Sequence, residues 1–503
     1  MLFRIRTLIL LIPLIMLPWL LTAQKAVKVN LVSAGSMLYN KQAGADLRRL
    51  IGDVVFEHEG AHLYCDSAYF YEEQNNIEAF GNIRIRVSDT LNIFGDQLLY
   101  DGNSRSARIT GKVRMVDRQT TLLTDRLLYD RNTEIASYVT GGTITGNENK
   151  LSSRKGYYFT ARKEFFFRDS VVLVNPRYTI RSDTLLYHTV SRIAFFYGPT
   201  RITSRENFIY CENGWYNTIS DMARFSRHAF IKNKGQLLRG DSLYYEHAGG
   251  YGKAVRNVSV TDSVRNIVIH GQQGIYKRAE GYSQLTDSLM AMIISDDDTL
   301  YLHSDTLRST FDTAGNTKTL SAYRHVKYYR RDLQGMCDSL HYTMTDSSMA
   351  MFGSPVLWSD ENQLTADSIR LWMLNKQPDS MMLYNTAMII SLADTGKFNQ
   401  IKGRDMTAYF SGNELIRVSV NGNAKTIYHA REDDGSQIGV NVAASSDMII
   451  FLSQKKIQRI KYLSRPDAVL YPETSLPPEE RVLPGFIWLE TRRPVSNRDV
   501  FRW

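Results

Sequence analysis

The sequence predicts an all-β protein built from about 13 stacked repeats of about 29 residues. Segments of similar pattern begin at an almost constant separation, and within each segment apolar residues alternate with polar ones, as in a strand. The chain also holds 29 Tyr and 21 Phe but only 12 Pro, a composition that favours strands over helices. A period of this length is typical of arrays in which each repeat buries its apolar face against its neighbours.

The period is clearest in the first half of the chain. Seven segments, from CDSAYFY and GDQLLYD to GDSLYYE, begin at Cys65, Gly95, Thr124, Ser153, Ser182, Cys211 and Gly240, at separations of 30 residues once and 29 residues five times. Looser copies begin at Gly271, Ser304, Cys337, Ala366, Arg404 and Ser446. The sixth position of a segment is aromatic in 11 of the 13 copies, and the fourth is mostly apolar or Gly.

Each early repeat also contains a second predicted strand, with an apolar residue twenty positions after the repeat start. The repeat is therefore expected to supply two strands, which stack into two sheets that face each other over a continuous apolar interior. At roughly 4.8 Å per rung, the whole array would be about 60 Å long. The inward positions predicted in this way are Phe70, Ile85, Leu98, Tyr100, Met115, Leu127, Tyr129, Ile144, Tyr158, Leu173, Leu185, Tyr187, Ile202, Tyr216, Ile231, Leu243, Tyr245 and Val260. They would line either an open groove or a closed, dry core.

Two patterns resemble metal-binding motifs, but neither is expected to hold a metal. Residues 58–62 spell H-E-x-x-H, which binds zinc only on a helix, whereas the repeat places these residues in a hairpin turn. The second repeat position is acidic in 11 copies, but one carboxylate per repeat does not make a calcium loop, so a turn role is expected. No nucleophile elbow or phosphate loop is present, and the sequence predicts no catalysis, no cofactor and no metal.

Four regions are expected along the chain. Residues 1–24 have the basic start, apolar run and small-residue end of a cleavable signal peptide. Regular repeats occupy residues 25–270, less regular and Met-rich repeats residues 271–472, and a Pro-rich tail residues 473–503. The formal net charge of +9 favours anionic lipid or glycan over nucleic acid as a partner of an exported protein. The register keeps Cys65, Cys211 and Cys337 too far apart to pair, so free, packed thiols are expected.

The chain resembles the OstA-like family, relatives of the periplasmic bridge component of lipopolysaccharide transport. The resemblance rests on the recurring Asp-x-apolar-x-aromatic strand, as in residues 96–100, 125–129 and 183–187, and on the Gly-led strands of residues 81–85 and 111–115. It implies a β-jellyroll of stacked antiparallel strands, also called a β-taco, whose interior shelters lipid A acyl chains. It also implies end-to-end strand stacking with an inner-membrane complex, an outer-membrane translocon or a second copy.

On this resemblance, the protein is a non-enzymatic periplasmic carrier or bridge that moves lipopolysaccharide toward the outer membrane. The inward positions would line the groove, and basic residues near its rim would contact lipid phosphates. The candidates for phosphate contact are Arg84, Arg86, Arg114 and Arg126. Association with the outer membrane is left open. The alternative is a structural solenoid, an envelope scaffold or adhesin, with a filled core and no lipid ligand.

Overall fold

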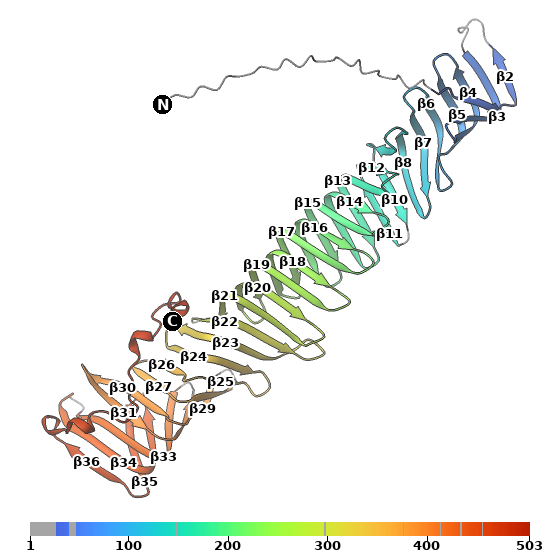
Figure 1. Ribbon diagram of the computed structural model, residues 1–503. Coiled ribbons are helices and arrows are strands. Elements are labelled where there is room, and N and C mark those ends of the chain that lie inside the picture. The colour runs from blue at the N-terminus through green and yellow to red at the C-terminus, as the bar shows by residue number, and fades with distance from the viewer. Residues whose placement is uncertain are drawn as a thin grey trace, which may run out of the picture. The chain divides into compact units, whose positions relative to one another are not determined.

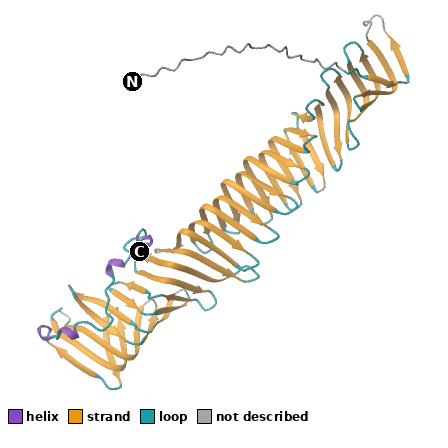
Figure 2. Cartoon of the chain, viewed as in Figure 1, coloured by secondary structure: helices purple, strands orange, loops and turns teal. Residues whose placement is uncertain are grey.

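Antiparallel β-strands make up nearly all of the described chain (Figure 1, Figure 2). The computed structural model describes residues 27–39, 47–146, 148–295, 298–375, 377–412, 414–432, 435–454 and 456–503, and the predicted signal peptide lies outside them. In the described part, no helix is both long and apolar enough to cross a membrane. The predicted all-β fold of stacked antiparallel strands is confirmed.

The chain divides into two units. Unit 1 comprises residues 1–147 and 154–162, and unit 2 comprises residues 148–153 and 163–503. The strands of unit 1 are β1 (Asn30–Ser33), β2 (Ser36–Tyr39), β3 (Leu47–His58), β4 (Ala61–Tyr71), β5 (Asn76–Arg86), β6 (Leu91–Asp101), β7 (Ser106–Asp117), β8 (Thr120–Asp130), β9 (Ile135–Tyr138), β10 (Gly142–Gly146) and β12 (Lys155–Phe159).

Unit 2 begins with long strands that resemble those of unit 1. These are β11 (Asn149–Ser153), β13 (Glu164–Asn175), β14 (Tyr178–His188), β15 (Ile193–Ser204), β16 (Phe208–Asn217), β17 (Met222–Asn233), β18 (Gln236–Glu246), β19 (Tyr251–Asp262), β20 (Ile267–Lys277), β21 (Tyr282–Ile294), β22 (Thr299–Phe311), β23 (Thr317–Arg330) and β24 (Leu333–Thr343). The ladder is continuous from β13 to β24, and residue 270 lies inside β20.

Consecutive strands pair as hairpins, so each repeat adds two rungs to one ladder. With neighbouring strands about 4.8 Å apart, one repeat advances the ladder by about 9.6 Å. The predicted length of about 60 Å allowed only one rung per repeat, and this assumption is wrong.

A β-bulge near the middle of each long strand pair shapes the ladder. Between β7 and β8 the register shifts between Thr110 and Val113, and the residues inside this shift, Gly111 and Lys112, have φ values of 81° and 45°. Such a bulge bends the strand and increases its twist. The apolar side chains on both sides of the bulge consequently face the same interior, and every long strand contributes to both walls, rather than one strand to each sheet.

The acidic residue of each repeat lies opposite this bulge. Asp66 accepts a hydrogen bond from the Asn82 side chain (2.9 Å), and Asp447 accepts one from the backbone N–H of Gly422 (2.9 Å). These carboxylates lie within strands, so the predicted turn role is wrong. They instead bond to the residues with positive φ that make the bend.

Beyond β24 the long strands are interrupted at the position of the bulge, and each is replaced by two shorter strands. The two walls are therefore separate ladders in this part of unit 2. One wall contains β26 (Val356–Ser359), β27 (Asn362–Thr365), β30 (Met388–Asp394) and β31 (Lys397–Lys402). The other contains β25 (Ser348–Phe352), β28 (Ser368–Leu374), β29 (Gln377–Tyr384) and β32 (Asp405–Ser411). Both ladders pair with β24 at one end and with β33 (Glu414–Arg431) at the other.

The C-terminal part completes unit 2. After β33 come β34 (Gln437–Ser453), β35 (Lys456–Leu463) and β36 (Asp467–Tyr471), followed by the short 3-10 turns η2 (Glu473–Ser475), η3 (Pro478–Glu480), η4 (Glu490–Arg492) and η5 (Asp499–Phe501). Both β35 and β36 pair with β34.

The bulge generates a stability prediction with a matched control. Gly111 and Gly60 both have φ +81°, but a Cβ at Gly111 would lie 2.5 Å from Asp96 Oδ2, whereas a Cβ at Gly60 would have no atom within 4 Å. Each change to Ala introduces left-handed strain of about 1 kcal/mol. We expect Gly111→Ala to lower the free energy of unfolding by at least about 1 kcal/mol more than Gly60→Ala, because Asp96 must also move. Urea denaturation measures both, and equal losses would refute a structural role for the carboxylate.

Candidate functional site

The inward side chains of unit 1 align in rows that cross the ladder from strand to strand. Directly paired neighbours on one wall are Phe56, Leu63, Ile85, Ile93, Met115, Leu122 and Ile144. On the other wall they are Phe70, Ile77, Tyr100, Ala107, Tyr129, Ala136 and Tyr158, with a second row of Ala79, Leu98, Ile109 and Leu127 beside them. The structure thus brings the predicted inward residues of this unit onto one apolar surface.

Large and small side chains alternate in the aromatic row. Tyr129 lies between Ala107 and Ala136, and Ala136 lies between Tyr129 and Tyr158. The rings therefore recur on every second rung, about 9.6 Å apart, with a small side chain between them. Tyr129, Tyr158 and the two alanines beside them are buried.

A narrow cleft with a cavity volume of about 30 Å³ lies between the two walls of unit 1. Its lining consists of Val29, Phe56, His58, Ala61, His62, Leu63, Ile77, Ile85, Leu98, Tyr100, Ala107, Tyr129 and Arg131. The walls meet where the rings of Phe56 and Phe70 lie 5.3 Å apart between centroids. Most of the lining side chains are apolar, and few are polar.

The polar groups of the cleft are tied together by hydrogen bonds. His58 Nδ1 lies 2.6 Å from the Tyr100 hydroxyl, and Arg131 donates to the carbonyl oxygens of His58 (2.9 Å) and Glu59 (3.1 Å). Burial raises the pKa of Tyr100, and the nearby Arg131 guanidinium opposes this shift. The phenol therefore stays neutral at physiological pH and keeps a polar hydrogen-bonding edge inside an apolar cleft.

The H-E-x-x-H segment forms a tight hairpin rather than a helix. His58 ends β3, His62 lies in β4, and Glu59 and Gly60 connect the strands with φ values of 49° and 81°. Two residues with positive φ are characteristic of the type I′ hairpin turn. The H-E-x-x-H pattern is therefore explained by a hairpin turn, and the helix on which this pattern binds zinc is not formed.

Unit 2 contains equivalent rows. Leu173, Ile202, Ile231 and Val260 occupy one wall, with Ile180, Ile209 and Leu238 between them. On the other wall, Tyr187, Tyr216 and Tyr245 alternate with Ala194, Ala223 and Gly252, and Leu185 and Leu243 lie in the adjacent row. Leu173, Leu185 and Leu243 are buried, whereas Ile202, Ile231, Val260 and these three tyrosines are half-buried.

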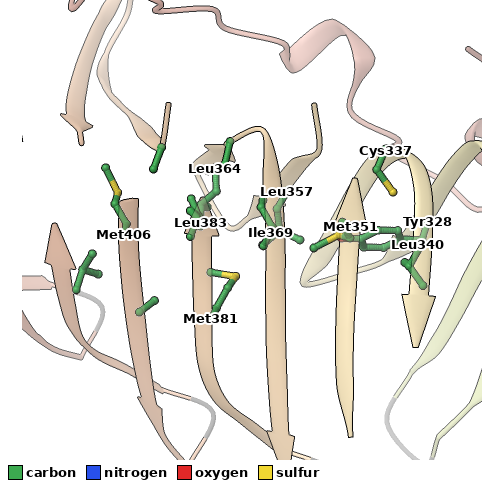
Figure 3. Close-up of a cluster of buried hydrophobic side chains, with 14 of the residues drawn as sticks. Tyr328, Cys337, Leu340, Met351, Leu357, Leu364, Ile369, Met381, Leu383 and Met406 are labelled. Carbon is green, nitrogen blue, oxygen red and sulfur yellow. The ribbon is translucent and has the colours of Figure 1, made fainter. Parts of the chain in front are cut away.

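Farther along unit 2 the interior is filled by side chains from both ladders. Figure 3 shows Leu357 and Leu364 of one wall together with Met351, Ile369 and Met381 of the other. Tyr328 donates a hydrogen bond to the Met351 sulfur at 3.4 Å. The Met-rich segments therefore supply flexible apolar side chains to this interior.

The four arginines predicted to contact phosphate do not line the cleft of unit 1. Arg84 and Arg114 alternate with buried neighbours and lie on the outer face, over the rings of Tyr64 (5.7 Å) and Phe94 (4.1 Å). Arg86 pairs with Asp89 at 3.0 Å, and Arg126 is exposed beside the bulge.

Arg131 is the arginine that lines the cleft, and sequence reasoning missed it. It follows Tyr129 by two residues, so the same alternation that placed Tyr129 on the inner face could have placed Arg131 there. It lies just beyond the end of β8, where the prediction had already ended the strand.

Residues 26–183 match the family described as OstA-like protein. The resemblance drawn from the strand motifs is therefore confirmed over this part of the chain. Among curated proteins none matches the sequence.

One solved structure that the chain resembles is LptH, the LptA homologous periplasmic component of the conserved lipopolysaccharide transport device from Pseudomonas aeruginosa. The match has 16% identity and a TM-score of 0.22, and it covers 28% of this chain and 100% of LptH. The fold is established by the strand pairings.

The cysteines are free and buried, as predicted, and are not part of the cleft lining. Burial raises the pKa of Cys65, Cys211 and Cys337 to about 12. The thiolate, which is the reactive form, is consequently scarce at neutral pH.

We expect these thiols to resist a thiol reagent such as DTNB in the native protein at pH 8 and to react once denaturant is added. Because their pKa is raised on folding, the neutral thiols contribute stability below about pH 9, and this contribution falls as the pH rises toward 12. Absorbance at 412 nm follows the labelling. Rapid stoichiometric reaction of the native chain would show that the thiols are not packed as described.

Proposed function

We propose that this protein is a non-enzymatic, exported carrier or bridge that binds lipopolysaccharide in the periplasm and passes it toward the outer membrane. The observation that carries the proposal is the set of unbroken apolar rows on the inner face of each unit, which in unit 1 border a narrow cleft. The OstA-like region at residues 26–183 supports the same function. No cofactor or catalytic group takes part.

Acyl chains would lie against the inward rows. An acyl chain gains about 0.8 kcal/mol for each methylene that it buries, so a few rungs suffice for stable binding. The lipid phosphates would lie at the mouth of the cleft near Arg131, whose two backbone hydrogen bonds hold its guanidinium in place. Movement along the rows would be driven by an upstream motor, because the chain supplies only the path.

Open strand edges would receive the neighbouring components. In the described residues, β2 of unit 1 pairs with β3 and β36 of unit 2 pairs with β34. Unpaired edges bind other strands readily. We propose that an inner-membrane complex and an outer-membrane translocon dock by strand addition at such edges, and that a second copy could bind in the same way.

A structural scaffold is the second candidate, and the packed interior beyond β24 favours it. Val420, Ile369 and Leu383 there are fully buried among other side chains. A scaffold of this kind would have a filled core and no lipid ligand, and its inward positions would serve stability alone.

Photo-crosslinking in cells separates the two functions. A benzophenone amino acid replaces Tyr129, Tyr187 or Leu243 on the inner face, or Leu128, Leu186 or Tyr244 on the outer face as matched controls. We expect lipopolysaccharide adducts at the inner positions and at least tenfold fewer at the outer ones, because adjacent residues of a strand point to opposite faces. If no inner position gives an adduct while the variants remain folded, the carrier function is refuted and the scaffold is favoured.

A further inference from the structure

The C-terminal segment, residues 473–503, lies on the outer face of a wall in unit 2, opposite the inner face that would hold lipid. Leu357 and Leu364 of this wall point into the interior cluster, whereas Trp358 and Gln363 point outward. Figure 1 shows the segment beside β26, β30 and β31. The wall is therefore covered on both faces.

Glutamines and apolar residues alternate across this outer face. The residues paired from strand to strand are Gln334, Trp358, Gln363, Ile390, Gln400 and Ile427. Glutamine consequently recurs on every second rung, about 9.6 Å apart. Gln363 and Gln400 are 0% exposed, although buried glutamine is uncommon.

Two of these glutamines bind the main chain of the C-terminal segment with the same geometry. Gln400 accepts from the N–H of Leu483 (2.7 Å) and donates to the carbonyl of Arg481 (2.9 Å). Gln363 makes the same two hydrogen bonds six residues farther along the segment. It accepts from the N–H of Leu489 (2.7 Å) and donates to the carbonyl of Ile487 (2.7 Å). Each amide satisfies two backbone groups of an extended stretch, as a neighbouring strand would.

Apolar contacts and the basic groups of the face complete the docking surface. Leu476 and Leu483 pack with Met388, Ile390 and Val440. Leu489 packs against the cluster of Met336, Val356 and Trp358.

Three lysines contact the segment. Lys402 donates to the carbonyl oxygen of Pro484 (2.5 Å) and Lys327 to that of Arg502 (2.7 Å), and Lys397 forms an ion pair with Glu473. The contacts therefore extend from residue 473 to residue 502.

The segment is less firmly held than the wall beneath it. Its regular structure consists of 3-10 turns of three residues, and most of its side chains are exposed or half-buried. The strands beneath it are bonded on both sides within the ladder. Regions with few buried contacts open at a lower free energy than core strands do.

We propose that this outer face is a binding site for an extended peptide and that residues 473–503 are its resident, exchangeable ligand. The glutamines recognise main-chain groups, so the specificity comes from apolar side chains six residues apart, as in Leu483 and Leu489. A partner protein with an extended segment of this pattern displaces the resident segment and attaches to the wall without entering the lipid path. The site is independent of the carrier function proposed above.

Hydrogen–deuterium exchange of the full-length chain tests whether the segment opens by itself. We expect its amides to exchange at least tenfold faster than those of β27 and β31. The double change Gln363→Leu and Gln400→Leu should speed exchange in the segment by a further tenfold or more and leave the strands protected. Gln437→Leu, at an exposed glutamine of the same unit, is the matched control. If the segment and the strands exchanged at one common rate, the segment would be an integral part of the core, and the proposal would be overturned.

A fluorescent peptide with the sequence of residues 478–493 tests the exchange directly by anisotropy. We expect it to bind at least tenfold more tightly to full-length protein carrying Leu483→Asp and Leu489→Asp, which weaken the resident segment, than to the wild type. Adding Gln363→Leu and Gln400→Leu should abolish this gain. If the weakened chain keeps its strand protection but does not bind the peptide, or if it loses that protection, the site is not exchangeable.

Discussion

The bulge in the middle of every second long strand is the constraint on which the rest of this protein depends. Side chains of a regular strand alternate between two faces, so an unbent ladder of this kind would be one flat sheet with a single apolar face. The extra residue in every second strand bends the ladder and turns the apolar side chains of both halves toward one interior. Because the bulge recurs once in each repeat, the bend continues along the ladder and two continuous walls result.

The bend has a local energetic cost. Pairs such as Arg256 and Asn257, with φ values of 58° and 50°, occupy a region that costs roughly 1 kcal/mol or more for residues other than Gly. A carboxylate opposite the bend offsets part of this cost, as where Asp241 accepts from the Asn257 side chain at 3.1 Å. The acidic position of the repeat is thus coupled to backbone geometry rather than to a ligand.

The second half of the chain uses the same bend differently. There the strands are interrupted at the bend, as at Gly353 and Ser354, and one wall buries both of its faces. A strand covered on both faces needs apolar residues at successive positions, and β26 with its sequence VLWS shows this run. The repeat pattern becomes irregular in this region for that reason, and the outer cover is supplied by the chain's own C-terminal segment.

The sequence by itself determined the repeat, the strands and the inward positions, because the alternation in segments such as residues 95–101 depends only on local geometry. It also predicted the OstA-like resemblance and the hairpin at His58. It could not place Arg131, or show that Arg84 and Arg114 stack on outer rings, since these positions depend on where a strand ends and which face it buries. Only the tertiary structure decided that two rungs belong to each repeat, that the acidic residues face a bulge, and that Gln363 and Gln400 bind residues 81 to 126 positions away. Such contacts join segments that share no sequence pattern, so the periodicity of the sequence does not predict them.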